Sequence, residues 1–487
     1  MNIFSHGFFL LWIISIILYY TIARRCQWLI LLFMSLAFYA YSITKAPVVL
    51  LLVSVLTYSG ALWITEAGKK KEVPKKKVKL VRRLITGICI AALIAGSAAG
   101  WFAMLGNSYF TLKAISYLND ADRDAENCER NYFFYLLYLI YLPTVLQGPF
   151  NRFAGFRESL EEKVSFDYTR FMHGLQRFLW GTFKKLVLTA RLEQAAVYVY
   201  ANLDTQSGLS ILIGTIACSL WLYTDFSGYM DMMLGMSGTF GISLPENFRQ
   251  PYFSKSIAEF WRRWHITLGG VIRDYIMMPF IQSKQGRGLR KHFKKYGKNA
   301  GKLAPVLAGT FLVWICTSLW HDFSWKYLIW GMYYCAIISS SLVLEGTYAK
   351  IRRKLSVKED SKIYAAFCMA RTWGLLLAAN MILQVQSPKD FYTAVRQIVG
   401  RSFFIGDYVS LSALNWIGQD AAVLGTGLLA LLFISIGKEK NINILEWLDR
   451  RILPIRWGVY YLLIFGVLLF GMYGSQQNAG QFLYMQF

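Results

Sequence analysis

Long uncharged apolar stretches are the feature that most limits how this chain can fold. Seven of them are of membrane-spanning length, near residues 4–23, 28–43, 46–65, 84–104, 303–320, 421–437 and 457–473. A bilayer core about 30 Å thick takes roughly 20 apolar residues per helical crossing. Because backbone polar groups inside a bilayer must be satisfied within the protein, these stretches predict helices rather than single strands. We therefore expect an all-α, polytopic membrane protein.

Five weaker stretches extend this interpretation, although several of them carry an Arg, a Lys or a Pro. They lie at residues 131–147, 176–200, 209–224, 325–346 and 364–384. Together the two sets predict about eleven crossings. The composition agrees, since 55% of the 487 residues are hydrophobic and only 16% are charged. The first run, Phe4–Tyr20, has no preceding basic region and no small-residue cleavage site, so we interpret it as a retained helix rather than a signal peptide.

The positive charge of the chain is concentrated in short polar stretches. Lys and Arg number 52 against 28 Asp and Glu, for a formal charge of +24. Such an excess in short loops is typical of the cytoplasmic side of a membrane protein, so no nucleic-acid partner is needed to explain it. This assignment makes Arg24 and Arg25 cytoplasmic and predicts that both termini lie outside. The four basic stretches are Lys69–Arg83, Lys284–Lys302, Lys350–Lys362 and Lys438–Arg456.

Two segments are too rich in charge for a simple crossing. They cover residues 105–130 and residues 247–282, and both mix charged side chains with aromatic ones. Charges this dense cannot face lipid, so we expect these segments to be re-entrant or to line a watery cavity within the protein. Chemistry is expected there. The sequence shows no internal repeat, which weakens an interpretation as an inverted-repeat transporter.

Histidine is the side chain best suited to take a proton from a hydroxyl near neutral pH. His6 stands at a helix start, His292 in a basic loop and His173 in an unremarkable amphipathic stretch. His321 lies between two apolar runs, which places an ionisable group within or near the membrane, where such groups are usually functional. His265 lies in EFWRRWHITL among aromatic and cationic neighbours. For both, a buried histidine with a purely structural hydrogen bond is the alternative.

The cysteines carry no metal or redox signal. No CxxC pair and no Cys/His metal spacing occurs among the seven, so we predict no metal site. Most lie in apolar stretches, where a cysteine behaves as a small buried hydrophobe. These are Cys89, Cys218, Cys316, Cys335 and Cys368.

Two motifs now give a specific resemblance. LYTDFSGYMDMMLGMSGTFGISLPENFRQPYFSKSIAEFWRRWHITLGGVIRDYIMMPF is followed about 40 residues later by SLWHDFSWKYLIWG. This pair resembles the core of the membrane-bound O-acyltransferases, and within them the bacterial branch that O-acetylates polysaccharides of the alginate type. GNSYFTLKAISYLND, YLIYLPTVLQGPFNRFAGF and LLFMSLAFYAYS are similar to further family segments. The resemblance implies crossings around a central tunnel, with a catalytic core in 105–348 between transmembrane regions 1–104, which includes the basic loop 69–83, and 349–487.

The resemblance also implies roles for particular residues. It makes His321 the essential catalytic histidine and His265 the second active-site residue. Its motif region further implies contacts to substrate from Asp225, Ser227, Asn247, Trp261, Arg262 and Trp320. An alcohol has too high a pKa to attack a thioester unaided, and a positioned base contributes about 10²–10⁴-fold. One departure is Asp322, where the family commonly has a small residue, and its effect on the imidazole of His321 stays open.

The implied donor is acetyl-CoA, arriving from the cytoplasm as a substrate, with no bound cofactor. The cations of Lys284–Lys302 would favour its phosphates, although they are equally well explained as determinants of topology. The C-terminal QFLYMQF resembles the aromatic end of the small peptide that works with the teichoic-acid D-alanyl transferase. Tyr484 is therefore a candidate to relay the acetyl group outward as a phenolic ester. The alternative for Tyr484 is an interfacial aromatic anchor.

The sequence thus predicts acetyl transfer across a bacterial cytoplasmic membrane, towards hydroxyls of an extracellular polysaccharide or peptidoglycan. Relatives imply a partner, an extracytoplasmic transferase of the serine-hydrolase type. D-alanyl transfer onto teichoic acids from a carrier-protein thioester is the nearest alternative, and labelled donors would separate the two. A transporter or flippase for a lipid-linked sugar is the third, because buried charges also suit substrate passage.

Overall fold

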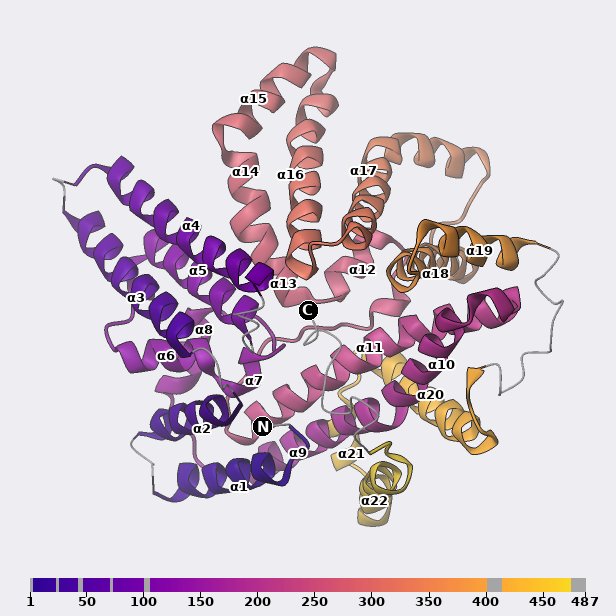
Figure 1. Cartoon of the computed structure of the whole chain (residues 1–487), viewed down its shortest axis with the longest axis horizontal. Coiled ribbons are helices and arrows are strands. Elements are labelled where there is room, and N and C mark those ends of the chain that lie inside the picture. The colour runs from indigo at the N-terminus through magenta and orange to yellow at the C-terminus, as the bar shows by residue number, and fades with distance from the viewer. Residues whose placement is uncertain are drawn as a thin grey trace. The chain divides into compact units, whose positions relative to one another are not determined.

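The computed structural model describes residues 3–22, 26–42, 47–70, 73–99, 106–400 and 414–473 (Figure 1). Helices make up the regular structure of these residues, and a single antiparallel β-bridge joins Phe248 to Trp264 within them. The predicted all-α fold is confirmed. The chain divides into two compact units, the first from the described parts of 1–181 and 229–245, the second from those of 182–228 and 246–473.

Seven helices of the described residues are long and apolar enough to cross a membrane. Two further apolar helices, α1 (His6–Thr21) and α2 (Gln27–Ser42), are shorter. The protein is therefore a multi-pass membrane protein, while the total of about eleven crossings stays a prediction. The seven are α3 (Pro47–Lys69), α11 (Gly208–Thr239), α16 (Lys298–His321), α17 (Trp325–Lys354), α18 (Lys362–Gln384), α20 (Gly418–Glu439) and α22 (Leu453–Phe470).

The apolar stretch 131–147 does not form one spanning helix. It divides into α6 (Tyr132–Ile140) and α7 (Leu142–Val145), with Tyr141 between them at φ −49° and ψ 116°. Pro143 in the first turn of α7 lacks a backbone N–H and its ring crowds a preceding helical turn, which favours a break in the helix at this point.

Buried polar groups in the first unit are satisfied by backbone at this break. α5 (Asn107–Arg123) packs against α3 and α4 (Lys75–Ala99), and its Lys113 is only 1% exposed. The Lys113 ammonium donates to the carbonyl of Tyr138 near the end of α6 and, at 2.9 Å, to the hydroxyl of Thr144. A cation at a helix C-terminus is favourable because the last carbonyls carry partial negative charge. The part of this charged segment that forms α5 is thus largely buried within the first unit, whereas residues 123–126 and Arg130 are exposed.

Close helix contacts in the first unit depend on glycine. A Cβ built on Gly174 of α9 (Tyr168–Phe183) would lie 2.7 Å from the carbonyl oxygen of Gly235 in α11. A Cβ on Gly235 would in turn lie 2.5 Å from that of Gly174. Neither residue can carry a side chain without separating the two backbones. The remaining short elements of this unit are α8 (Phe153–Glu161) and η1 (Ala125–Asn127).

The second unit begins with a change of helix type. After α9 the chain passes through a buried π-helical turn, η2 (Lys184–Thr189), into α10 (Ala190–Ala201). π turns are rare overall, but those that occur are often found at functional sites. η2 packs against α20 and α22, and the backbone N–H of Met472 donates to the carbonyl of Leu186 at 3.0 Å. The predicted crossing 176–200 therefore contains a local widening of the helix.

The segment 247–282 is built from short helices rather than a span. α12 (Ile257–Arg263), α13 (Ile266–Ile272), the π turn η5 (Arg273–Met277) and α14 (Met278–Gln282) lead to the basic helix α15 (Lys284–Phe293), which packs against α16 (Figure 1). The remaining elements are η3 (Leu203–Thr205), η4 (Pro251–Phe253), η6 (Lys294–Tyr296), α19 (Pro388–Val399) and α21 (Ile444–Asp449).

Four of the five cysteines predicted to be buried are buried, while Cys316 on α16 is half-buried.

Candidate active site

His321 is the last residue of α16, at the turn into α17. The helix ends there because Asp322 adopts an extended backbone, with φ −167° and ψ 149°, and its side chain is exposed. His321 itself is 8% exposed. α17 can approach this end of α16 because residue 331 is glycine, since a Cβ there would lie 1.9 Å from the hydroxyl of Ser318. The sequence thus places a buried imidazole at a tightly packed helix corner.

Aromatic rings surround His321. The ring of Tyr327 stacks on the imidazole at 5.4 Å and 14°, and Trp330 meets it edge to face at 5.5 Å. Behind Trp330 lie three further aromatic rings at centroid distances of 5.2–5.7 Å from it, namely Trp261, Trp314 and Tyr334. This flank is therefore packed and apolar. In such a low-dielectric environment electrostatic effects on a reacting group are larger than in water.

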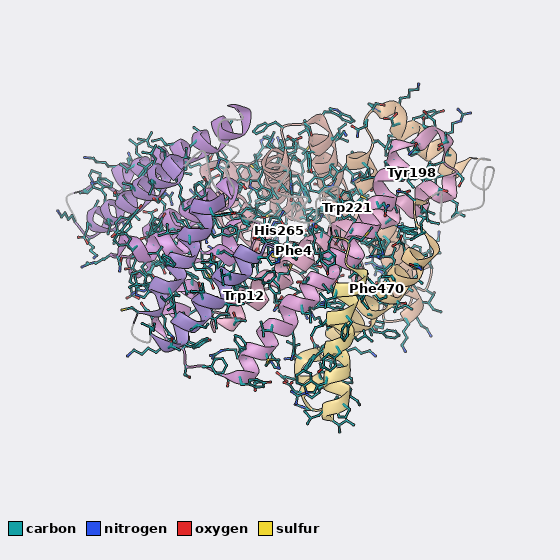
Figure 2. The ribbon with its side chains drawn as sticks, turned by 60° about the horizontal axis from the view of Figure 1, so that its bottom comes forward. Phe4, Trp12, Tyr198, Trp221, His265 and Phe470 are labelled. Atoms are coloured by element: carbon teal, nitrogen blue, oxygen red, sulfur yellow. The ribbon has the colours of Figure 1, made fainter. Side chains whose placement is uncertain are left out.

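His265 precedes α13 in an unusual backbone conformation. It stands at φ 48° and ψ 49°, a left-handed region that costs a non-glycine residue of order 1–3 kcal/mol. The conformation is held by backbone pairing on either side, because Ile266 N–H donates to the carbonyl of Asn247 at 3.0 Å and Arg249 N–H to that of Arg263 at 2.9 Å. His265 is 3% exposed and is labelled in Figure 2.

Asn247 fixes the tautomer of His265. Its side-chain oxygen accepts the backbone N–H of Thr267 at 3.1 Å, which identifies that atom as the oxygen rather than the amide nitrogen. The same oxygen lies 3.2 Å from Nδ1 of His265. Nδ1 must then be the donor, so the proton sits on Nδ1 and the lone pair on Nε2. Burial lowers the pKa of His265 well below its ordinary range and the nearby His321 lowers it further, which keeps the ring neutral.

Trp320 contacts both imidazoles. Its ring lies 6.2 Å from that of His265 and 4.8 Å from that of His321. Phe226 of α11 meets the His265 ring edge to face at 4.8 Å. Four residues implied by the motifs, His265, His321, Asn247 and Trp320, therefore come together, and Trp261 joins them through the aromatic cluster. The indole N–H of Trp261 has no hydrogen-bond partner among the described residues.

The other predicted site residues lie differently. Arg262 is exposed. Asp225 and Ser227 are buried on α11, where Asp225 pairs with Lys185 and Ser227 accepts a hydrogen bond from Lys184 at 2.9 Å. Tyr484 lies outside the described residues, as do Arg24 and Arg25. Within the part of the chain that the structure describes, no three His, Cys, Asp or Glu side chains are grouped so that they could hold a metal ion.

Several residues of this site were not predicted from the sequence. Arg263, next to the exposed Arg262, forms a bidentate ion pair with Glu439 of α20 at 2.7 and 3.0 Å. This pair links α12 to α20. Lys184 and Lys185 carried a usable signal, because adjacent lysines inside an apolar stretch must be paired within the protein. The ring contacts of Tyr327 and Phe226 carried none, because aromatic residues are common throughout the chain.

Comparison with known proteins identifies the fold's family. The model of MBOAT, the membrane-bound O-acyltransferase family, matches residues 35–383. The chain belongs to this family. The family predicted from the motifs is therefore confirmed, and the protein is an O-acyltransferase.

Three relatives show how far the similarity extends along each chain. The probable alginate O-acetylase AlgI of Azotobacter vinelandii is 26% identical over 463 residues, which cover 89% of this chain and 84% of the relative. The peptidoglycan O-acetyltransferase of Helicobacter pylori is 28% identical over 47% of this chain and 45% of its own length. The teichoic acid D-alanyltransferase of Bacillus subtilis is 29% identical over 49% of this chain and 58% of its own length. Similarity to the acetylase thus extends over most of both chains.

Proposed function

We propose that this O-acyltransferase moves an acetyl group from cytosolic acetyl-CoA across the membrane, towards hydroxyl groups of an extracellular polysaccharide or of peptidoglycan. The observation that carries the proposal is the pair of buried histidines, His321 and His265, which share Trp320 as a neighbour in an apolar, tightly packed environment. Two neutral imidazoles at one place suit proton transfer to and from hydroxyl and thiol groups.

In the proposed reaction His321 acts as general base. It takes the proton of the attacking hydroxyl while the oxygen bonds to the thioester carbon, and the C–S bond then breaks. The imidazolium returns that proton to the departing coenzyme A thiolate, so that an ester and a free thiol leave a neutral ring. The aromatic flank of Trp330 and Tyr327 supports this role because it excludes water from one side of the ring.

His265 would assist from a fixed tautomer. Since its Nδ1–H is committed to Asn247, only Nε2 can accept a hydrogen bond, and a hydroxyl donating to Nε2 would be oriented for attack. The neutral state is required for this, and the burial of the ring favours it. Asn247 is then a positioning residue rather than a direct substrate contact.

The path of α16 supports transfer across the membrane. The helix begins at Lys298, shortly after the basic helix α15, and its 24 residues end at His321. At 1.5 Å per residue it is roughly 36 Å long, the thickness of a bilayer core with margin. We propose that the cations at Lys284–Lys302 attract the donor's phosphates on the cytoplasmic side, from which the thioester enters the protein towards His321.

Basic residues at the ends of later helices support the same orientation. α16, α17, α18, α20 and α22 follow one another along the chain. Arg352, Arg353 and Lys354 end α17 and Lys362 begins α18, while Lys438 lies near the end of α20 and Arg456 near the start of α22. If successive spans alternate in direction, these charges fall on one side, the cytoplasmic one by the positive-inside rule, and the chain leaves outward after α22.

The names of relatives support the proposed acceptor. A probable alginate O-acetylase and a peptidoglycan O-acetyltransferase resemble this chain, which supports a polysaccharide or peptidoglycan hydroxyl as acceptor. We propose an extracytoplasmic transferase of the serine-hydrolase type as partner, and Tyr484 as the residue that passes the acetyl group on. Tyr484→Phe with undiminished acetylation in cells would remove the relay.

D-alanyl transfer is the second candidate, because two teichoic acid D-alanyltransferases also resemble the chain. The first of them covers 49% of the chain, against 89% for the alginate acetylase, so the acetyl donor is favoured. Membership of an acyltransferase family gives the transporter alternative no support.

One experiment tests the donor. Purified protein in liposomes would be supplied separately with radiolabelled acetyl-CoA and with D-alanyl carrier protein, each with and without a soluble oligosaccharide acceptor. Acceptor-dependent label transfer from acetyl-CoA, absent in His321→Ala, is the expected result. Transfer from the D-alanyl carrier protein alone would overturn the acetyl assignment.

A further inference from the structure

Two buried lysines of the second unit have no part in the proposed chemistry. Lys184 and Lys185 begin the π turn η2 and are 2% and 4% exposed. Charged side chains in the interior of a membrane protein are expensive to bury and are retained where they have a structural or functional task. Lys185 forms an ion pair with Asp225, whose side chain is likewise buried, with 1% of it exposed.

These lysines belong to a set of three side-chain bonds between η2 and α11. Besides the Lys185–Asp225 pair, the Lys184 ammonium donates to the Ser227 hydroxyl at 2.9 Å. The Thr189 hydroxyl donates to that of Thr224 at 2.9 Å and lies equally close to the carbonyl of Lys184, five residues earlier. We call this set, which consists of Lys184, Lys185 and Thr189 with Thr224, Asp225 and Ser227, the η2–α11 ladder.

The bonds of the ladder lie on both sides of one residue of α11, Phe226. Asp225 and Ser227 are the neighbours of Phe226 on either side, and both are bonded to η2. Phe226 itself is 0% exposed and meets the His265 imidazole edge to face at 4.8 Å and 86°. It also contacts Phe248 at 5.0 Å, beside Asn247. The helix is thus bonded through the two residues that flank its contact with His265.

We propose that the η2–α11 ladder is a positioning device, in which Lys184 and Lys185 set the rotation of α11 and so hold Phe226 against the His265 ring. Because Phe226 and the Asn247 oxygen contact the same imidazole, the ladder fixes the direction in which Nε2 of His265 points. The π turn contributes by presenting two consecutive lysines and Thr189 to α11. This inference rests on the proposed function, in which His265 orients a hydroxyl.

A direct role in binding substrate fits Asp225 and Ser227 less well. The Asp225 carboxylate is already neutralised by Lys185, and the Ser227 hydroxyl, 4% exposed, already accepts from Lys184. A substrate would have to separate a buried ion pair to reach either. Their exposure and bonding instead match residues that act through the helix that carries them.

The test is a double-mutant cycle on the full-length protein. Phe226→Ala and the paired replacement Lys185→Met with Asp225→Leu are made separately and together, and kcat and KM for acetyl-CoA are measured per folded molecule. Replacing both members of a buried ion pair by apolar residues avoids leaving a lone buried charge. Each change is expected to lower kcat by about 10- to 100-fold with KM within about twofold, since small misplacements of a reacting group cost that much.

The combined variant distinguishes the explanations. If the ladder acts through Phe226, adding Phe226→Ala to the paired replacement lowers kcat no further. Multiplicative losses would overturn the proposal, and so would a paired replacement with unchanged kcat. Ser227→Ala, which removes a single hydrogen bond of the ladder, is the second variant, and it is expected to lower kcat per folded molecule without raising KM.

A matched control is a buried lysine elsewhere. Lys113→Met removes a buried ammonium of the first unit that bonds the Tyr138 carbonyl and the Thr144 hydroxyl. It is expected to reduce the yield of folded protein but to leave kcat per folded molecule within about twofold. An equal fall in kcat for Lys113→Met would overturn the proposal. A wild-type protein without acetyl transfer would instead contradict the proposed function.

Discussion

The side-chain oxygen of Asn247 lies 3.2 Å from Nδ1 of His265 and accepts a hydrogen bond from that nitrogen. The direction of this bond follows from a second bond to the same oxygen, which the backbone N–H of Thr267 donates. A single amide thereby decides both the tautomer and the direction of a buried imidazole. Its effect on the chemistry can be measured from the pH dependence of the reaction.

Asn247→Asp should make the enzyme sensitive to acid. In the native protein burial holds the pKa of His265 well below its ordinary range, so the ring stays neutral and activity should not follow its titration near pH 7. A carboxylate at position 247 favours imidazolium and raises that pKa. Activity should then fall as the pH drops through the raised pKa, because protonated Nε2 accepts no hydrogen bond. Measurement of kcat as a function of pH would reveal this added loss of activity at low pH.

Thr267→Val is the control for that experiment. It removes the hydroxyl that also donates to the Asn247 oxygen, at 2.8 Å, but introduces no charge. Its pH profile should keep the native shape. Identical profiles for Asn247→Asp and the native enzyme would exclude an active role for the tautomer of His265.

Replacement of His321 tests the base directly. His321→Ala should lower acetyl transfer by about 10²–10⁴-fold, the usual contribution of a general base. Thermal unfolding in detergent is measured alongside, because the variant also loses the ring contacts with Tyr327 and Trp330. The measurement is label transfer from acetyl-CoA by purified protein. Native rates from the alanine variant would contradict catalysis by this residue.

Gly331→Ala should disturb the corner that holds His321. The new Cβ would lie 1.9 Å from the Ser318 hydroxyl, and such overpacking costs about 1–3 kcal/mol. The unfolding temperature should fall, and Ser318→Ala added to it should restore part of the loss. Gly346→Ala on the same helix is the matched control, because nothing lies within 4 Å of its Cβ. Equal unfolding temperatures for the two alanine variants would show that the close contact of residue 331 with Ser318 does not affect stability.

Replacement of Arg262 and replacement of Arg263 should have different effects, although the two residues are neighbours in the chain. Arg263→Ala removes the two bonds to Glu439 and should lower the unfolding free energy by about 1–3 kcal/mol. Arg262 is exposed, so Arg262→Ala should leave stability unchanged. If Arg262 contacts substrate as its motif implies, and that substrate is the donor, KM for acetyl-CoA should rise in that variant. Urea or thermal unfolding together with donor titrations would measure both, and a stability loss from Arg262→Ala would be inconsistent with its exposure.

Sequence reasoning found the two histidines because each stands in a distinctive local setting. His321 lies between apolar runs, and His265 lies in the segment 247–282, whose charges exclude a simple crossing. The position of His321 beside Trp320 could be read from the motifs, since the two are neighbours in the chain. The left-handed backbone of His265 could not, because it depends on pairing with residues 247–249.

The polar ladder was missed for a related reason. Lys185 and Asp225 are 40 positions apart, and no local periodicity joins an apolar helix to a partner at that separation. The apolar content of 131–147 was similarly misleading as a span, because hydropathy does not register that the ring and the missing N–H of Pro143 favour a break in the helix. Apolar content predicts that a segment is buried, whereas partners and breaks depend on the folded chain.

Helix α16 has one further consequence. Its lysine-rich beginning and its terminal histidine are separated by roughly 36 Å, so the two substrates never need to share a compartment. In the proposed orientation the coenzyme's phosphates can stay on the cytosolic side and the sugar outside, and the acetyl group is the only part of the donor that is left beyond the membrane. A small inhibitor aimed at His321 would then need no route into the cell.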